Sequence, residues 1–174
     1  MASTTHVPVS EYLRTVFRPD REYIDGEIRE RNVGKYEHAR VQALSAIWFG
    51  QHESEWNASV VTEQRVRVAA TRVRIPDVTL LPPGNHPEVI TDPPILIVEI
   101  LSPDDTYSDT EDRARDYLAM GVPAVWILYP YTRTGRMCIG RTWTGAETLV
   151  VPDTPINLEL EQIYRRLDSN AAAS

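Results

Sequence analysis

An almost unbroken run of aliphatic residues, PILIVEILS (residues 94–102), contains one charged side chain, that of Glu99. Such a run is typical of a strand that is covered on both faces, so we predict that it is the central strand of a sheet. An ionised carboxylate in that position loses several kcal/mol of hydration free energy unless a partner compensates it. The partner is expected to be either a buried arginine or a divalent cation shared with other acids, and the run itself leaves both open.

The segments after this run indicate an α/β architecture. We expect a helix that begins at Ser108 or Asp109 and ends at Met120, just before Gly121. Residues 124–130 (AVWILYP) then form a second buried strand. A strand, a helix and a second strand with this spacing make a right-handed crossover, so the two strands are expected to be parallel.

The rest of the chain supplies further strands and helices. The dipeptide Asp25-Gly26 favours a tight turn in a hairpin over residues 22–32, and an apolar stripe over residues 36–49 predicts a long helix that Gly50 would end. The other expected elements are a helix at 8–16, strands at 58–69 and 73–81, a proline-rich connection at 81–94, an edge hairpin made from 136–143 and 147–152, and a helix near 158–167. Together they predict a mixed central sheet flanked by helices, with an N-terminal β-hairpin.

Length and composition narrow the class of protein. The 174 residues suffice for one domain, expected at residues 1–168 with a frayed tail at 169–174. The N-terminal segment lacks a basic start and an apolar run, and no later segment approaches a membrane span, so we expect a cytoplasmic protein. Cys138 is the single cysteine, which excludes an intramolecular disulfide and a multi-cysteine zinc site. The net charge of −7 opposes non-specific binding to nucleic acid, although acids that hold a cation contribute to it.

Asp77 is a second acid with a chemical interpretation. It lies in RIPDVTLL, directly after Pro76, which cannot donate to a sheet ladder and therefore favours the start or edge of a strand. An aspartate there can simply cap a turn. Two acids on adjacent strands can also converge on one Mg²⁺ or Mn²⁺ ion, which would polarise a phosphate and lower the pKa of an attacking water.

Several fragments of the chain together resemble a known family. They are, in order, REYIDGE (21–27), KYEH (35–38), RIPDV (74–78), EILSPDD (99–105), DTEDRARDY (109–117) and GVPAVWILYP (121–130). In these fragments and in their order the chain resembles the Uma-two family of PD-(D/E)XK endonuclease-like proteins, over nearly its whole length.

The resemblance implies a restriction-endonuclease-like fold and a metal site. Asp77 and Glu99 would bind Mg²⁺ or Mn²⁺ together with the main-chain carbonyl of Ile100, and Glu22 would be an auxiliary acid. From the residues alone, Glu22 is better interpreted as a solvated charge of the hairpin.

The sequence departs from the family where a lysine is expected. In the family the motif lysine has moved onto the following helix, and here Arg113 stands in that place, while Leu101 fills the parent position. Arginine can bind a phosphate but stays charged and cannot act as a general base. Alternatively, Arg113 forms surface ion pairs with Asp109 and Asp116. Lys35 is a second candidate for the cation.

Two further residues match the family's pattern. Tyr117 lies one helical turn after Arg113, where it can pack beneath the site or donate a phenol hydrogen bond to it. His38, near the start of the long helix, is either a satisfied structural histidine or a site residue.

Four arginines stand at alternate positions of two predicted strands. They are Arg65, Arg67, Arg72 and Arg74. Side chains at alternate positions point the same way, so these could follow a DNA backbone, but a solvated hairpin face is the favoured interpretation.

These observations lead to two functional hypotheses. The first is a Mg²⁺- or Mn²⁺-dependent DNA endonuclease that uses Glu22, Asp77, Glu99 and Arg113. The second is a catalytically weakened family member that binds nucleic acid or a protein partner, because Arg113 replaces the lysine. A homodimer that pairs through a sheet edge or a helix is also considered.

Overall fold

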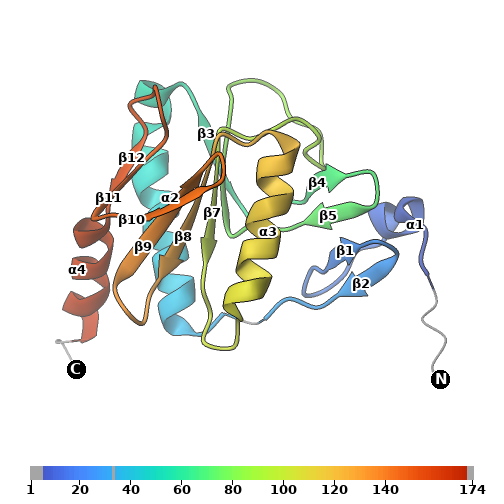
Figure 1. Cartoon of the computed structure of the whole chain (residues 1–174), viewed down its shortest axis with the longest axis horizontal. Coiled ribbons are helices and arrows are strands. Elements are labelled where there is room, and N and C mark those ends of the chain that lie inside the picture. The colour runs from blue at the N-terminus through green and yellow to red at the C-terminus, as the bar shows by residue number, and fades with distance from the viewer. Residues whose placement is uncertain (1–5, 33, 172–174) are drawn as a thin grey trace.

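Figure 1 shows the computed structural model of the chain, which describes residues 6–32 and 34–171. Its elements are, in chain order, α1 (Val9–Arg14), β1 (Glu22–Ile24), β2 (Glu27–Arg29), α2 (Tyr36–Trp56), β3 (Ser59–Thr62), β4 (Val66–Ala69), β5 (Arg72–Arg74), β6 (Val78–Leu81), β7 (Leu96–Ile100), α3 (Tyr107–Met120), β8 (Ala124–Tyr129), β9 (Thr134–Ile139), β10 (Thr142–Gly145), β11 (Thr148–Val150), β12 (Asn157–Glu159) and α4 (Leu160–Ala171). The fold is α/β, as expected.

A six-stranded mixed sheet organises the fold. Its strand order is β10-β9-β8-β7-β6-β3, so β7 lies inside the sheet. β7 is parallel to β8 and antiparallel to β6, which confirms the predicted central strand and parallel pair. α2 covers one face of the sheet and α3 covers the other (Figure 1).

The two faces of β7 have different neighbours because side chains alternate along a strand. Val98 belongs to the larger core cluster, together with Leu44 and Phe49 of α2 and Trp126 of β8. On the opposite face, Ile97 packs with side chains of α3. Glu99, two residues later, therefore faces α3 as well.

The predicted N-terminal hairpin is confirmed and belongs to a second sheet. β1 and β2 pair around Asp25 and Gly26, whose φ angles are 49° and 98°. The strand order of this four-stranded sheet is β2-β1-β5-β4, and Figure 1 shows the sheet beside α3.

The strands predicted at 58–69 and 73–81 are each two strands. Glu63 has a φ of 51°, a left-handed conformation that ends β3 before β4 begins. Pro76 separates β5 from β6, because it cannot donate to a ladder. In both places the chain crosses from one sheet to the other.

The ends of two helices differ from the prediction. α2 continues through Gly50 and ends at Trp56, and the next residue, Asn57, caps it with a left-handed φ of 51°. Packing on both sides of Gly50, by Phe49 and Trp56, outweighs the weak helix preference of one glycine. α3 begins after Thr106, whose side chain accepts a hydrogen bond from the Asp109 N–H, rather than after Ser108 or Asp109.

The C-terminal part was predicted in outline. The edge hairpin predicted between 136–143 and 147–152 is wrong: Gly140 turns the chain inside the first segment, so β9 pairs with β10, and β11 pairs with β12 in a separate two-stranded sheet. α4 continues to Ala171, so the predicted tail is helical at 169–171, and residues 172–174 lie outside the described residues. None of the helices in the described ranges combines the length and apolar character needed to cross a membrane.

Candidate active site

Glu99 lies in the interior of the protein, near the carboxyl end of β7. Its exposed fraction is 2%, and the Tyr117 hydroxyl donates a hydrogen bond of 2.6 Å to its Oε1 atom. Burial, with a smaller contribution from the nearby Asp77 carboxylate, raises the pKa of Glu99 to about 7 against the opposing charge of Arg113. The neighbours of Glu99 therefore do not fully offset the hydration that its ionised carboxylate loses on burial.

Arg113 extends from α3 between two acids. Its Nη1 atom lies 3.7 Å from Oε2 of Glu99, and its Nε atom lies 3.9 Å from Oε2 of Glu22. Both separations are longer than a hydrogen bond, so the guanidinium balances charge without a close pairing. The alternative of surface ion pairs is wrong, because Asp116 pairs instead with Arg72 and Arg74.

Asp77 is buried at the beginning of β6, with an exposed fraction of 3%. Its Oδ2 atom accepts the Ile100 N–H at 2.7 Å and lies 3.3 Å from Nε2 of His38, while its Oδ1 atom accepts a hydrogen bond from Arg31 at 3.0 Å. Asp77 thus joins the beginning of β6 to the end of β7. It does not merely cap a turn.

The strand register explains why the two acids meet. Val78 pairs with Val98 in the antiparallel ladder, so one step further along Asp77 stands opposite Glu99. Opposed positions of such a pair lie about 5 Å apart at Cβ. The charge of Asp77 also raises the pKa of Glu99, so the two carboxylates lie near each other, as expected for acids on adjacent strands; their joint binding of a cation stays a prediction.

Pro76, just before β6, lacks the N–H that a ladder residue would offer to the Ile100 carbonyl. The pairing of β6 with β7 ends at Val78 and Val98, and beyond it the Ile100 N–H still points toward β6, because it donates to Oδ2 of Asp77. The carbonyl of a strand residue points to the same side as its N–H. Because proline has no N–H to donate, the Ile100 carbonyl oxygen stays available to a cation or to another hydrogen-bond donor.

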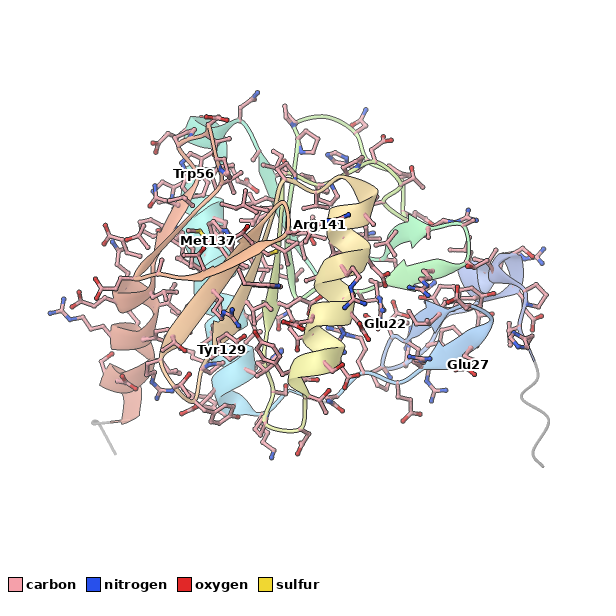
Figure 2. The ribbon with its side chains drawn as sticks, viewed as in Figure 1. Glu22, Glu27, Trp56, Tyr129, Met137 and Arg141 are labelled. Carbon is pink, nitrogen blue, oxygen red and sulfur yellow. The ribbon has the colours of Figure 1, made fainter. Side chains whose placement is uncertain are left out.

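Glu22 is not the solvated hairpin charge that residue-level reasoning favoured. Its exposed fraction is 4%, and Figure 2 shows it between the β1–β2 hairpin and α3. Arg74 donates to Oε2 of Glu22 at 2.9 Å and the Ile75 N–H donates to Oε1 at 3.2 Å. Glu22 also contributes to the raised pKa of Glu99, which places its charge near the other acids.

The accessory candidates separate into two groups. Tyr117 and His38 reach the acids directly, and although burial lowers the pKa of His38, the hydrogen bond and charge of Asp77 raise it above its ordinary value. Lys35 lies 3.7 Å from Asp104 on the exposed loop after β7. The structure gives it no contact with Asp77 or Glu99 among the described residues.

The four alternating arginines do not form an open basic track. Arg65 pairs with Asp20, Arg72 pairs with Asp25, and Arg74 is buried between Glu22 and Asp116. Arg67 donates to the Ala70 carbonyl at 2.8 Å. The predicted solvated hairpin face is therefore wrong for Arg74. Because three of the four guanidiniums pair with acids, the four arginines are not free to follow a DNA backbone.

Sequence reasoning missed Arg31 as a site residue. It follows the hairpin, and nothing in its neighbourhood in the sequence signals a contact with Asp77, 46 residues later. A polar cleft of about 220 Å³ opens beside Glu22 and Arg113. Its other lining residues are Arg29, Glu30, Asn32, Arg74, Asp105, Asp109 and Asp112.

The oxygen atoms at the ends of β6 and β7 fit a small, hard divalent cation. Oε2 of Glu99 accepts no hydrogen bond from the residues that the structure describes, and its ion-pair contact with Arg113 is long. No group of three or more acidic, histidine or cysteine side chains within residues 6–32 and 34–171 could hold a metal ion. Mg²⁺ is commonly held by only one or two carboxylates, with water and phosphate completing its shell, so Asp77, Glu99 and the Ile100 carbonyl remain a chemically suitable donor set.

Comparisons with known proteins agree with this architecture. The chain aligns over 92% of its length with 99% of a solved chain from Anabaena variabilis, described as "a putative nuclease belonging to DUF820", with a TM-score of 0.80 and 18% identity. At that identity the likeness shows the fold, which is that of the restriction-endonuclease-like proteins. No curated protein matches the chain in sequence. The model of the Uma2 family, described as "Putative restriction endonuclease", matches residues 9–164, and the chain belongs to this family.

Proposed function

We propose that the protein is a Mg²⁺- or Mn²⁺-dependent phosphodiesterase that cuts DNA. The observation that supports this most is Glu99, a buried acid that faces a second acid, Asp77, across a strand end. A purely structural acid in that place would be expected to have a close guanidinium partner, whereas Arg113 stays 3.7 Å away.

Each residue of the proposed site has a separate role. Asp77, Glu99 and the Ile100 carbonyl would hold the cation, which when bound polarises a phosphate and lowers the pKa of a bound water. Arg113 supplies positive charge to the phosphate, and because it stays protonated it does not act as a base. Glu22 accepts from Arg74 and lies 3.9 Å from Arg113, so it orients these guanidiniums.

Plasmid nicking with Mg²⁺ or Mn²⁺ tests the proposed activity. The wild-type protein should convert supercoiled DNA to the open circular form, and Asp77→Asn and Glu99→Gln should not. Tyr36→Ala, which changes an exposed residue of α2, is the control and should cut like the wild type. Equal cutting by all four proteins would remove both acids from the reaction.

Calorimetric titration with Mn²⁺ tests cation binding separately from cutting. The wild type should bind, and Asp77→Asn and Glu99→Gln should each weaken binding at least tenfold. Equal affinities in the three proteins would contradict the proposed donor set.

A second function is favoured by Arg113 and Arg31. These two guanidiniums lie beside Glu99 and Asp77, and a weakened family member that binds nucleic acid without cutting it needs no cation there. Arg113→Lys separates the two functions. An inert wild type with an active lysine variant would favour the binding protein, and an active wild type would favour the nuclease.

A further inference from the structure

Arg136 on β9 is held by aromatic rings. Its guanidinium carbon lies 5.6 Å from the ring centroid of Tyr107 and 5.5 Å from that of Trp143. Within the described part of the chain Arg136 forms no ion pair, although the protein carries an excess of acids. The ring contacts position the guanidinium and leave its N–H groups free for an anion.

The register places this cluster on the same side of the sheet as the candidate active site. Glu99 pairs with Ile127 on β8, and Ile127 pairs with Arg136 on β9. Side chains in one such row share a face, so Arg136 and Glu99 both project toward α3. Two strand spacings of about 4.8 Å separate their backbones, roughly 10 Å in all.

A groove begins at Trp143 and extends along α3. Its volume is about 630 Å³, with Ala114, Leu118 and other residues of α3 on one side, Trp143 and Arg141 of the β9–β10 hairpin on the other, and Cys138 also lining it. Figure 2 shows Arg141 beside α3. Arg141 also forms no ion pair among the described residues, whereas Arg115 in the same groove pairs with Asp112 and Glu111 adds one negative charge.

We infer that this groove, with Arg136, Tyr107 and Trp143 at one end, binds a single-stranded segment of nucleic acid. The inference rests on the proposed function, because it names an unpaired strand as the substrate; the groove lies on the Arg141 side of α3, whereas Glu22 of the candidate site lies on the other side (Figure 2). Aromatic rings offer stacking surfaces to unpaired bases, and the two arginines without carboxylate partners can meet phosphates. In a duplex the faces of the bases are already stacked on one another, so the rings can contribute only to an unpaired segment. Tyr107, with 47% of its surface exposed, is accessible to such a base.

Fluorescence anisotropy tests the inference without any cutting. Binding of a labelled oligo(dT) 20-mer and of a labelled hairpin duplex of equal length is measured for the full chain in EDTA. The wild type should bind the single strand more tightly than the duplex. Trp143→Ala, Tyr107→Ala and Arg136→Ala should each weaken single-strand binding about tenfold, and Trp143→Phe should retain most of it because a stacking ring remains.

Two surface variants serve as matched controls. Tyr36→Ala removes an exposed tyrosine from α2, on the opposite face of the sheet, and Arg166→Ala removes an exposed arginine from α4. Both should bind oligo(dT) like the wild type, and melting curves check that every variant is folded. Equal binding of oligo(dT) and duplex, or unchanged affinity in Trp143→Ala and Tyr107→Ala, would overturn the inference. Tight single-strand binding without nicking in either Mg²⁺ or Mn²⁺ would reject the proposed nuclease but would still support the single-strand groove.

Discussion

Replacing Glu99 with glutamine should stabilise the protein when no divalent cation is present. Burial raises the pKa of Glu99 from 4.5 to about 7, and this value already includes the opposing effect of Arg113. The folded protein therefore binds this proton more tightly than the unfolded chain does. Proton binding at Glu99 therefore stabilises the folded protein. This contribution to the free energy of unfolding is fully present below pH 4.5 and is lost as the pH rises through about 7.

The shift sets the size of the effect. Each pKa unit corresponds to about 1.36 kcal/mol, so ionised Glu99 lowers the free energy of unfolding by about 3 kcal/mol above pH 7. Glutamine has nearly the shape of the protonated acid and can still accept from Tyr117. Glu99→Gln should therefore raise the free energy of unfolding by about 3 kcal/mol at pH 8 and by under about 1 kcal/mol at pH 5. At pH 8 this corresponds to a rise in Tm of roughly 6–12 °C.

Urea unfolding followed by circular dichroism, in EDTA at pH 5 and pH 8, measures this difference. Glu88→Gln, which changes an exposed glutamate of the loop between β6 and β7, is the control and should leave the free energy of unfolding unchanged at both pH values. If Glu99→Gln is no more stable than the wild type at pH 8, Arg113 already compensates the carboxylate, and the reasoning that Glu99 needs a cation fails.

Three further substitutions test neighbouring contacts. Tyr117→Phe removes a hydrogen bond to an ionised acid, so it should cost about 2 kcal/mol at pH 8 and raise the pKa of Glu99 further, which NMR titration of the carboxyl carbon can follow. Arg113→Ala leaves Glu99 without its nearest cation, but an acid whose pKa is already about 7 can take up a proton at pH 8 for about 1.4 kcal/mol, so urea unfolding should show a loss of about 1 kcal/mol at pH 8 that shrinks at pH 5. Gly121→Ala places a side chain at a φ of 107° and should lower the free energy of unfolding by about 1 kcal/mol or more, while Ala119→Gly in the same helix gives the ordinary cost of changing a helical residue.

The parts of the fold that could be predicted depend on local patterns. The aliphatic run around Glu99, the following helix and the strand at 124–130 each have an unambiguous period, and a short crossover allows one handedness. The splits at Glu63 and Pro76 were missed because the hydrophobic alternation continues across them. It does not reveal that the chain leaves one sheet and enters another.

Residue chemistry alone predicted the part of the candidate site that lies on adjacent strands, and the family resemblance added Arg113, Tyr117 and His38 on the helices. Asp77 and Glu99 were found because a buried acid demands a partner and the neighbouring strand supplied one. The burial of Glu22 depends on Arg74, 52 residues later in the chain, and the contact of Arg31 with Asp77 spans 46 residues. No sequence period connects such pairs, so Glu22 and Arg74 were interpreted as solvated charges and Arg31 was not singled out.

The most direct test of the cation site is the anomalous difference map of a crystal soaked in Mn²⁺. A single strong peak should lie between the Asp77 and Glu99 carboxylates and the Ile100 carbonyl, and it should be absent from a Glu99→Gln crystal treated in the same way. A map with no peak there, with the Arg113 guanidinium still the nearest cation to Glu99, would contradict the proposed metal centre.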